Sequence, residues 1–164
     1  MANLIEHKKA HFDYEILESY EAGIQLFGGE VKSVRAHRGK LEGAHITVRG
    51  GEAFLINSEI PPYQPGNETG GGYEPTRNRR LLLTKKELAE LATAEEKAGL
   101  TIIPLSMYNK GRIIKIRIAI ARGKKKSDKR EAIKKREAIR DIAREVKQGV
   151  AREVKRLGNR LRLE

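Results

Sequence analysis

The stretch TIIPLSMY (101–108), NKG (109–111) and RIIKIRIAIA (112–121) gives the clearest structural signal in this chain of 164 residues. Its last segment places isoleucine at every second position from Ile114 to Ile120, with Lys115 and Arg117 in between. This period of two is typical of an antiparallel strand with one face in the core and the other in water. The turn residues 109–111 join it to residues 101–108, so the stretch predicts a β-hairpin.

The sequence before this hairpin also favours strands. Residues 13–26 are rich in strand formers and are interrupted at Glu21-Ala22-Gly23, which predicts two strands and a turn. Residues 44–49 and 52–57 predict a second hairpin around two glycines. Two helices are expected among the strands, one at residues 30–35 and one that begins at the capping-box sequence TKKE (84–87). Residues 61–80, which contain four prolines, are expected to form a long surface loop.

These elements predict a mostly β fold. We expect a small closed or partly open six-stranded β-barrel, similar to the oligonucleotide/oligosaccharide-binding (OB) fold, with two or three short helices. Residues 1–121 form this body, and residues 122–164 form a basic tail. The chain has no cysteine, which excludes disulfides and thiolate metal ligands. Its apolar runs are too short to cross a membrane and no signal peptide is recognisable, so we expect a cytoplasmic protein without a membrane partner.

The basic residues are unevenly distributed. Residues 122–164 hold 17 Lys or Arg and 7 Asp or Glu, whereas residues 1–121 hold 17 and 15, which gives net charges of +10 and +2. A basic arm behind a nearly neutral body is typical of a nucleic-acid-binding protein. Two basic clusters predict phosphate contacts. One surrounds the end of the long loop (Arg77, Arg79, Arg80, Lys85 and Lys86), and the other marks the start of the tail (Lys124, Lys125, Lys126, Lys129 and Arg130).

The tail has a helical pattern. Apolar residues recur at spacings of three and four: Ile139, Ala143, Val146, Val150, Val154, Leu157 and Leu161. Gly149 and Gly158 weaken such a helix, and no globular sequence remains for it to pack against. We therefore expect the tail to be frayed when free and helical when bound to a partner.

No catalytic constellation is recognisable. His7 and His11 have the spacing of metal ligands on a helix, but no carboxylate or cysteine completes a site, and solvent-exposed histidines are the simpler interpretation. Glu21 and Glu30 have no converging polar residues. A P-loop and a nucleophile elbow are both absent from the sequence. We expect a binding protein rather than an enzyme, with no metal and no cofactor.

Several short segments together point to a known family. They are KKA (8–10), DYEI (13–16), EAGI (21–24), GEVKSVR (29–35), GEAFL (51–55), IPPY (60–63), RRLLL (79–83), PLSMY (104–108), AIARGKK (119–125) and DKRE (128–131). In this order they resemble the SsrA-binding proteins, or small protein B, over about residues 8–137. The resemblance implies an OB-type barrel that grips the tRNA-like part of transfer-messenger RNA. It also implies a tail that enters the decoding centre and mRNA channel of a stalled 70S ribosome, so that the protein acts as a monomeric adaptor in trans-translation.

The resemblance also assigns candidate RNA-binding residues. Those on the body are Glu21, Leu82 and Thr84, to which we add the basic residues Lys32, Arg79 and Arg80 as candidates. Those of the ribosome-facing junction are Gly123, Lys124, Lys125, Asp128, Lys129 and Arg130. The sequence departs from the family pattern at Thr84 (usually His or Asn), Ser127 (His or Tyr) and Ala138 (commonly Trp), and Gly28-Gly29 replaces the usual Gly-Thr.

Three other functions fit parts of the sequence. A generic OB-fold ribosomal or translation protein would share the composition. The apolar tail residues could form a coiled coil with a second copy, although their mean spacing is nearer 3.7 than 3.5 residues. An RNA-modifying enzyme would need catalytic residues that the sequence does not show.

Overall fold

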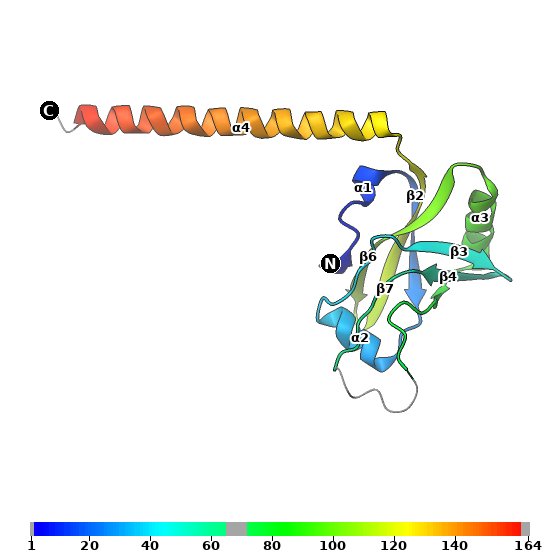
Figure 1. Cartoon of the computed structure of the whole chain (residues 1–164). Helices are drawn as coiled ribbons and strands as arrows, with labels where there is room; N and C mark the ends of the chain where they lie inside the picture. The colour runs from blue at the N-terminus through cyan, green and yellow to red at the C-terminus, as the bar shows by residue number, and fades with distance from the viewer. Residues whose placement is uncertain (1, 65–71, 162–164) are drawn as a thin grey trace. The chain divides into compact units, whose positions relative to one another are not determined.

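The computed structural model describes residues 2–64 and 72–161, and the chain divides into two compact units, Met1–Lys124 and Lys125–Glu164. We call the first unit the body. Its elements are β1 (Asn3–Glu6), α1 (Ala10–Asp13), β2 (Tyr14–Ile24), α2 (Gly28–Arg35), β3 (His45–Arg49), β4 (Glu52–Ile56), β5 (Arg79–Leu82), α3 (Lys85–Glu96), β6 (Leu100–Lys110) and β7 (Ile113–Gly123) (Figure 1). The second unit contains the long helix α4 (Lys126–Leu161).

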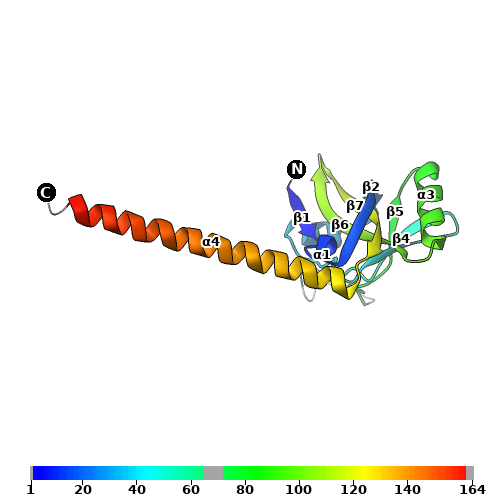
Figure 2. The same ribbon diagram turned by 90° about the horizontal axis from the view of Figure 1, so that it is seen from above.

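The body is built on one antiparallel sheet in the order β1-β6-β7-β2-β5-β4-β3. Among the described residues, β1 and β3 each pair on one side only, so the sheet does not close. The sheet nevertheless curls (Figure 2). The curl brings β3 into contact with β6. The prediction of a mostly β, OB-like fold with a helical tail is therefore confirmed. The number of strands differs, because the structure has seven where the sequence predicted six.

The largest difference lies in residues 13–26. They form one strand, β2, instead of two strands with a turn, because Glu21, Ala22 and Gly23 all continue the ladder with β7. Gly23 also pairs with Leu82 of β5 on its other side. The glycine that was interpreted as part of a turn therefore lies where two strands approach closely. Strands β1 and β5 were not predicted. Of the long loop expected at residues 61–80, residues 65–71 lie outside the described part of the chain, and Arg79 and Arg80 belong to β5.

Other local predictions are confirmed. The hairpin β3–β4 turns at Gly50 and Gly51. Both have positive φ (57° and 75°), as the favoured turn of a two-residue hairpin requires at its central residues. Helix α3 begins with a complete capping box, since Thr84 accepts a hydrogen bond from the Glu87 amide and the Glu87 side chain accepts one from the Thr84 amide. The turn residues thus precede the start of β4 and the cap precedes the start of α3, and β5 lies between these two elements.

The core lies inside the curled sheet. The four alternating isoleucines of β7 all point into it and pack with Leu41, Leu55, Leu91 and Met107. The opposite side of β7 was expected to be wet throughout, but this is wrong for Ala119 and Ala121, which are both fully buried. Ala121 packs with Ala10 of α1 and Ile103 of β6. The short helix α1 thus covers a part of the sheet that the alternation alone assigns to solvent.

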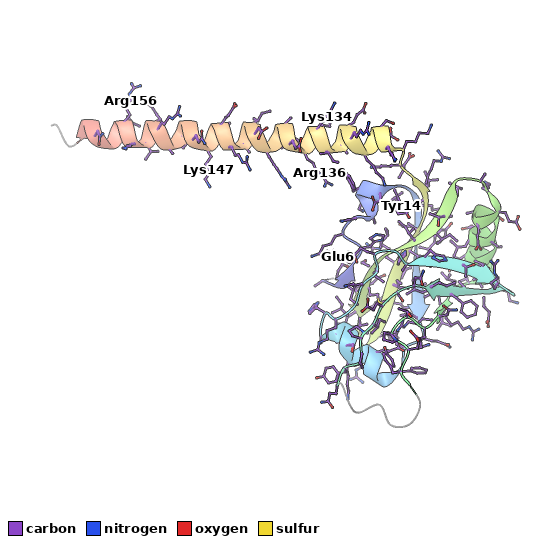
Figure 3. The ribbon with its side chains drawn as sticks, viewed as in Figure 1. Glu6, Tyr14, Lys134, Arg136, Lys147 and Arg156 are labelled. Atoms are coloured by element: carbon purple, nitrogen blue, oxygen red, sulfur yellow. The ribbon has the colours of Figure 1, made fainter. Side chains whose placement is uncertain are left out.

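Helix α4 runs without interruption through Gly149 and Gly158. Its described apolar side chains are exposed, with 64% of Ile139 and 59% of Val150 accessible to solvent. Figure 3 shows Lys134 and Arg156 on one side of the helix and Arg136 and Lys147 on the other. The predicted helix is present, and fraying of the free tail remains a prediction. Within residues 2–64 and 72–161, none of the helices combines the length and the apolar character that a membrane span requires.

Candidate nucleic-acid interface

The outward side of β2 organises the candidate site on the body. Ala22, Ile24 and Leu26 pack into the core, so the alternate residues Glu21, Gln25 and Phe27 are exposed. Strand β5 continues this surface sideways, because Gly23 lies opposite Leu82 and the Gln25 amide donates to the Arg80 carbonyl at 3.0 Å. We call the surface formed by Glu21, Gly23, Arg80 and Leu82 the outer face. The structure thus brings together three of the predicted RNA-binding residues from segments about sixty residues apart.

Glu21 is held at the edge of this face by two donors. Lys110 of β6 donates to Oε1 at 2.7 Å, and the buried hydroxyl of Tyr108 donates to Oε2. The hydrogen bonds from Lys110 and then Tyr108 hold the pKa of the Glu21 carboxyl below its ordinary value. Burial and the bond to Glu21 raise the pKa of Tyr108 to about 12. Glu21 is therefore ionised at neutral pH, and its remaining lone pairs can accept donors from a ligand.

Glycine at position 23 allows the two strands of the outer face to approach closely. A Cβ on Gly23 would lie 3.1 Å from the Cβ of Leu82 and 3.4 Å from its Cδ1. Leu82 itself is 49% exposed, although the residues on either side of it pack inward. The absence of a side chain at Gly23 therefore sets the position of an apolar side chain that faces solvent.

Arginine side chains lie on and beside the outer face, and the predicted residue Lys32 lies on another element. Arg117 of β7 lies opposite Glu21 in the ladder, and its guanidinium sits 5.4 Å from the centroid of the Tyr108 ring. Arg80 pairs with Glu52 at 2.7 Å, both about half exposed. Lys32 lies on α2, with its ammonium 5.8 Å from the centroid of the Tyr63 ring. Arg117 was not predicted as a site residue, although it occupies an outward position of the best-defined strand in the sequence.

Arg79 requires a correction. The expectation that it contacts RNA does not fit its side chain, which has no exposed surface. Its Nε donates to the buried Glu30 carboxylate at 3.0 Å, and its other donors reach Ser58, Pro75 and the Arg77 carbonyl. Arg77 completes the group with two further hydrogen bonds to Glu30, from Nε and Nη2. Arg79 thus fixes the loop and β5 from within, beneath the outer face.

Two predicted residues cap helices. The Thr84 hydroxyl accepts a hydrogen bond from the Glu87 amide at 3.3 Å, so Thr84 is the N-cap of α3. It lies two residues after Leu82 of the outer face. At the start of α4, the Asp128 carboxylate accepts from the Lys125 amide at 3.3 Å. This bond stabilises the N-terminus of the helix, where a negative charge is also favoured by the helix dipole.

The remaining junction residues lie in two settings. Gly123 ends β7 opposite Tyr14, and Lys124 is fixed to α1 by its amide to the Asp13 carbonyl (2.9 Å) and its ammonium to the His11 carbonyl (2.8 Å). Arg130 is exposed on the first turns of α4, and the Lys129 amide donates to the Lys125 carbonyl. The main-chain and side-chain bonds of Lys124 thus hold the last residue of the body in place.

The histidine pair offers no metal site in the described part of the chain. His7 is buried and its Nδ1 lies 3.0 Å from the Pro104 carbonyl, so the expectation that both histidines are exposed is wrong for His7. In residues 2–64 and 72–161 no group of three or more His, Asp or Glu side chains is placed to hold a metal ion.

Comparison with known proteins places the chain among its relatives. A family model described as "SmpB protein" matches residues 4–148. The chain belongs to the SmpB family. The matched SmpB region includes the body from residue 4 onward and the proximal part of α4, and it leaves residues 1–3 and 149–164 outside.

Individual SmpB relatives are similar over nearly their full length. The SsrA-binding protein of Microcystis aeruginosa (strain NIES-843 / IAM M-2473) is 48% identical over 144 residues, which cover 88% of this chain and 93% of that protein. The SsrA-binding protein of Streptococcus mutans serotype c is 48% identical over 143 residues, covering 87% and 91%. A solved chain from "tmRNA-SmpB: a journey to the center of the bacterial ribosome" has a TM-score of 0.63 and 42% identity, covering 78% of this chain and 92% of that one.

Proposed function

We propose that this SmpB-family chain is an RNA-binding adaptor of trans-translation. The body binds the tRNA-like part of transfer-messenger RNA, and the tail enters the decoding centre and mRNA channel of a stalled ribosome. The observation that carries the proposal is the outer face, which joins Glu21, Leu82 and Arg80 on two paired strands of a chain 48% identical to SsrA-binding proteins.

The chemistry of the outer face suits RNA. Glu21 is ionised and keeps lone pairs that can accept hydrogen bonds from base amino groups or ribose hydroxyls. Lys110 sits against this carboxylate and Arg117 lies opposite it in the ladder, which reduces its repulsion of phosphate groups. Leu82 offers an exposed apolar side chain against which a base or sugar can pack. These groups provide recognition and charge but no catalytic pair, so we propose binding rather than catalysis.

The tail has a different chemistry. Helix α4 has 36 residues and therefore extends for about 54 Å at about 1.5 Å per residue. All eight aromatic residues of the chain precede position 109, so the tail contributes charge and guanidinium groups without any ring. Such a helix can follow a phosphate-lined channel through electrostatic attraction. We propose that this division between the body and the tail is functional, in a monomer that works in the cytoplasm, where ribosomes translate.

Two variants of the full chain test the proposal together. Removing residues 126–164 leaves the body intact, because none of the core residues lies in the tail. This variant should bind transfer-messenger RNA but fail to support peptide tagging on stalled ribosomes. Glu21→Ala should show the reverse order of effects: its affinity for transfer-messenger RNA should fall more than its affinity for an unrelated tRNA, and tagging should be lost only through that weaker binding.

Gel-shift affinities and an in vitro tagging assay separate the outcomes. Full tagging by the truncated chain would reduce the tail to a solubility appendage. An equal loss of affinity for both RNAs in Glu21→Ala would indicate a generic RNA-binding barrel, which is the main rival function. Tyr108→Phe serves as the matched control for Glu21, because it removes one donor to the carboxylate and retains the ring beneath Arg117.

A further inference from the structure

Phe27 is an aromatic side chain that the core does not use. Its ring is 61% exposed, whereas its neighbour Leu26 packs against the core. It is the residue before α2, in an extended conformation with ψ of 160°, and its side chain makes no capping hydrogen bond. An exposed phenyl ring on a body whose other outward residues are largely polar gains no stability from burial. The ring is therefore accessible to a ligand.

The backbone places Phe27 at the end of the outer face. Outward positions along this segment are Glu21, Gly23, Gln25 and Phe27, in the alternation that sends Ala22, Ile24 and Leu26 inward. The adjacent segment runs antiparallel to it, from Leu82 through Arg80 to Arg77. The Arg80 carbonyl accepts a hydrogen bond from the Gln25 amide. Continued past Gln25, this register sets Phe27 opposite Asn78, and the side chain of the adjacent residue Arg77 lies over the Phe27 ring.

Arg77 supports the ring from one side. Its guanidinium carbon lies 3.9 Å from the centroid of the Phe27 ring. The guanidinium is itself fixed, because Nε and Nη2 donate to the two oxygens of the buried Glu30 carboxylate at 2.5 and 3.0 Å. With Arg79 on the same carboxylate, the group holds two guanidinium cations and one anion. The ring therefore rests on a rigid, net positive base, which lowers the conformational cost of using it for binding.

We propose that an unpaired base of the bound RNA stacks on Phe27, at the end of the outer face. The inference rests on the proposed function and adds a contact to it. A flat aromatic surface backed by a fixed cation is suited to a base, whose π-face stacks on rings in single-stranded RNA sites while phosphates are attracted by the cation. The surroundings, Gln25, Arg77 and Arg80, are polar or charged, which disfavours an apolar protein partner at this position.

Variants at Phe27 in the full chain test the stack. Phe27→Ala and Phe27→Leu should both weaken the binding of transfer-messenger RNA by roughly 5- to 150-fold, the effect of losing one base stack. Leucine keeps an apolar side chain without a π-face, and Phe27→Trp should retain affinity. The slope of log K against log salt should stay unchanged in all of them, because the ring carries no charge. Leu17→Ala is the matched control, since Leu17 is an exposed apolar residue of β2 that lies away from the outer face and lines the hollow beside α3.

The Phe27→Trp variant gives a direct second readout. The chain has no tryptophan, so its fluorescence comes from that one position. Binding of transfer-messenger RNA should quench this fluorescence and shield it from a soluble quencher, and Leu17→Trp should show neither change. Normal affinity in Phe27→Leu, or unquenched fluorescence in Phe27→Trp on a saturated complex, would overturn the stack. Failure of the unmodified chain to bind this RNA would instead overturn the proposed function.

Discussion

Replacing Glu30 with glutamine tests whether the buried ion pairs hold the loop and β5 in place beneath the outer face. Glutamine has the shape of glutamate without its charge. The carboxylate of Glu30 is fully buried and accepts three hydrogen bonds from Arg77 and Arg79. Arg77 is 23% exposed and can turn toward water, but Arg79 has no exposed surface and keeps its charge. The cost of the substitution therefore falls mainly on Arg79.

The expected loss is about 3–5 kcal/mol of the free energy of unfolding, the usual cost of leaving a buried charge without its partner. The matched control is Glu52→Gln, which makes the same chemical change in the pair with Arg80. Both members of that pair are nearly half exposed, so its loss should cost at most about 1 kcal/mol. The difference between the two variants isolates the effect of burial.

Urea denaturation followed by tyrosine fluorescence measures this difference. All five tyrosines lie in the body, so the signal reports the body and not α4. The midpoint should fall for Glu30→Gln while the dependence of the free energy on urea stays unchanged. A Glu30→Gln variant within about 1 kcal/mol of Glu52→Gln would refute the reasoning, because the two guanidiniums would then be compensated without the carboxylate.

Two further predictions concern the RNA-binding residues. In the first, Lys124, Lys125, Lys129 and Arg130 are all replaced by alanine. The slope of log K for ribosome binding against log salt should become shallower by roughly three units, at about 0.7–0.9 per phosphate contact, and binding of isolated transfer-messenger RNA should change much less. An unchanged slope in a filter-binding titration would show that these residues make no ionic contacts. The second is that Gly23→Ala displaces Leu82, because the new methyl group would lie 3.1 Å from the Leu82 Cβ. The variant should bind RNA more weakly without unfolding of the body. If its RNA affinity and its Leu82 chemical shifts both equal those of the unmodified chain, the role given to Gly23 is wrong.

Local signals predicted the elements that are specified by neighbours in sequence. The two glycines at 50–51 determine the β3–β4 hairpin, the TKKE box determines the start of α3, and the alternating isoleucines determine β7. Strand β2 was divided in error because a glycine inside a strand looks like a turn. Gly23 instead makes room for Leu82 of the neighbouring strand, which is 59 residues further along the chain. Strand β5 was missed because it contains two arginines, and a charged residue in a short strand is taken as a surface position.

The candidate site was predictable where it depends on strand alternation and on resemblance. Glu21, Arg80 and Leu82 are exposed together as expected. Arg79 was assigned to RNA because no local pattern indicates that its partner is Glu30 on α2, 49 residues earlier. Phe27 and Arg117 were overlooked for the same reason, since the importance of each depends on a neighbour from a distant segment.

The exposure of α4 bears on how long a copy of the chain survives in a cell. The helix buries almost none of its side chains, so its local opening carries a free-energy cost far below that of the body. Basic residues are spread along it, and each is a cleavage position for a protease that cuts after lysine or arginine. We expect a copy whose tail is bound to a partner to be protected from such cutting, and a free copy to be cut first within α4. Turnover would in this way remove spare copies and preserve engaged ones, without any dedicated degradation signal.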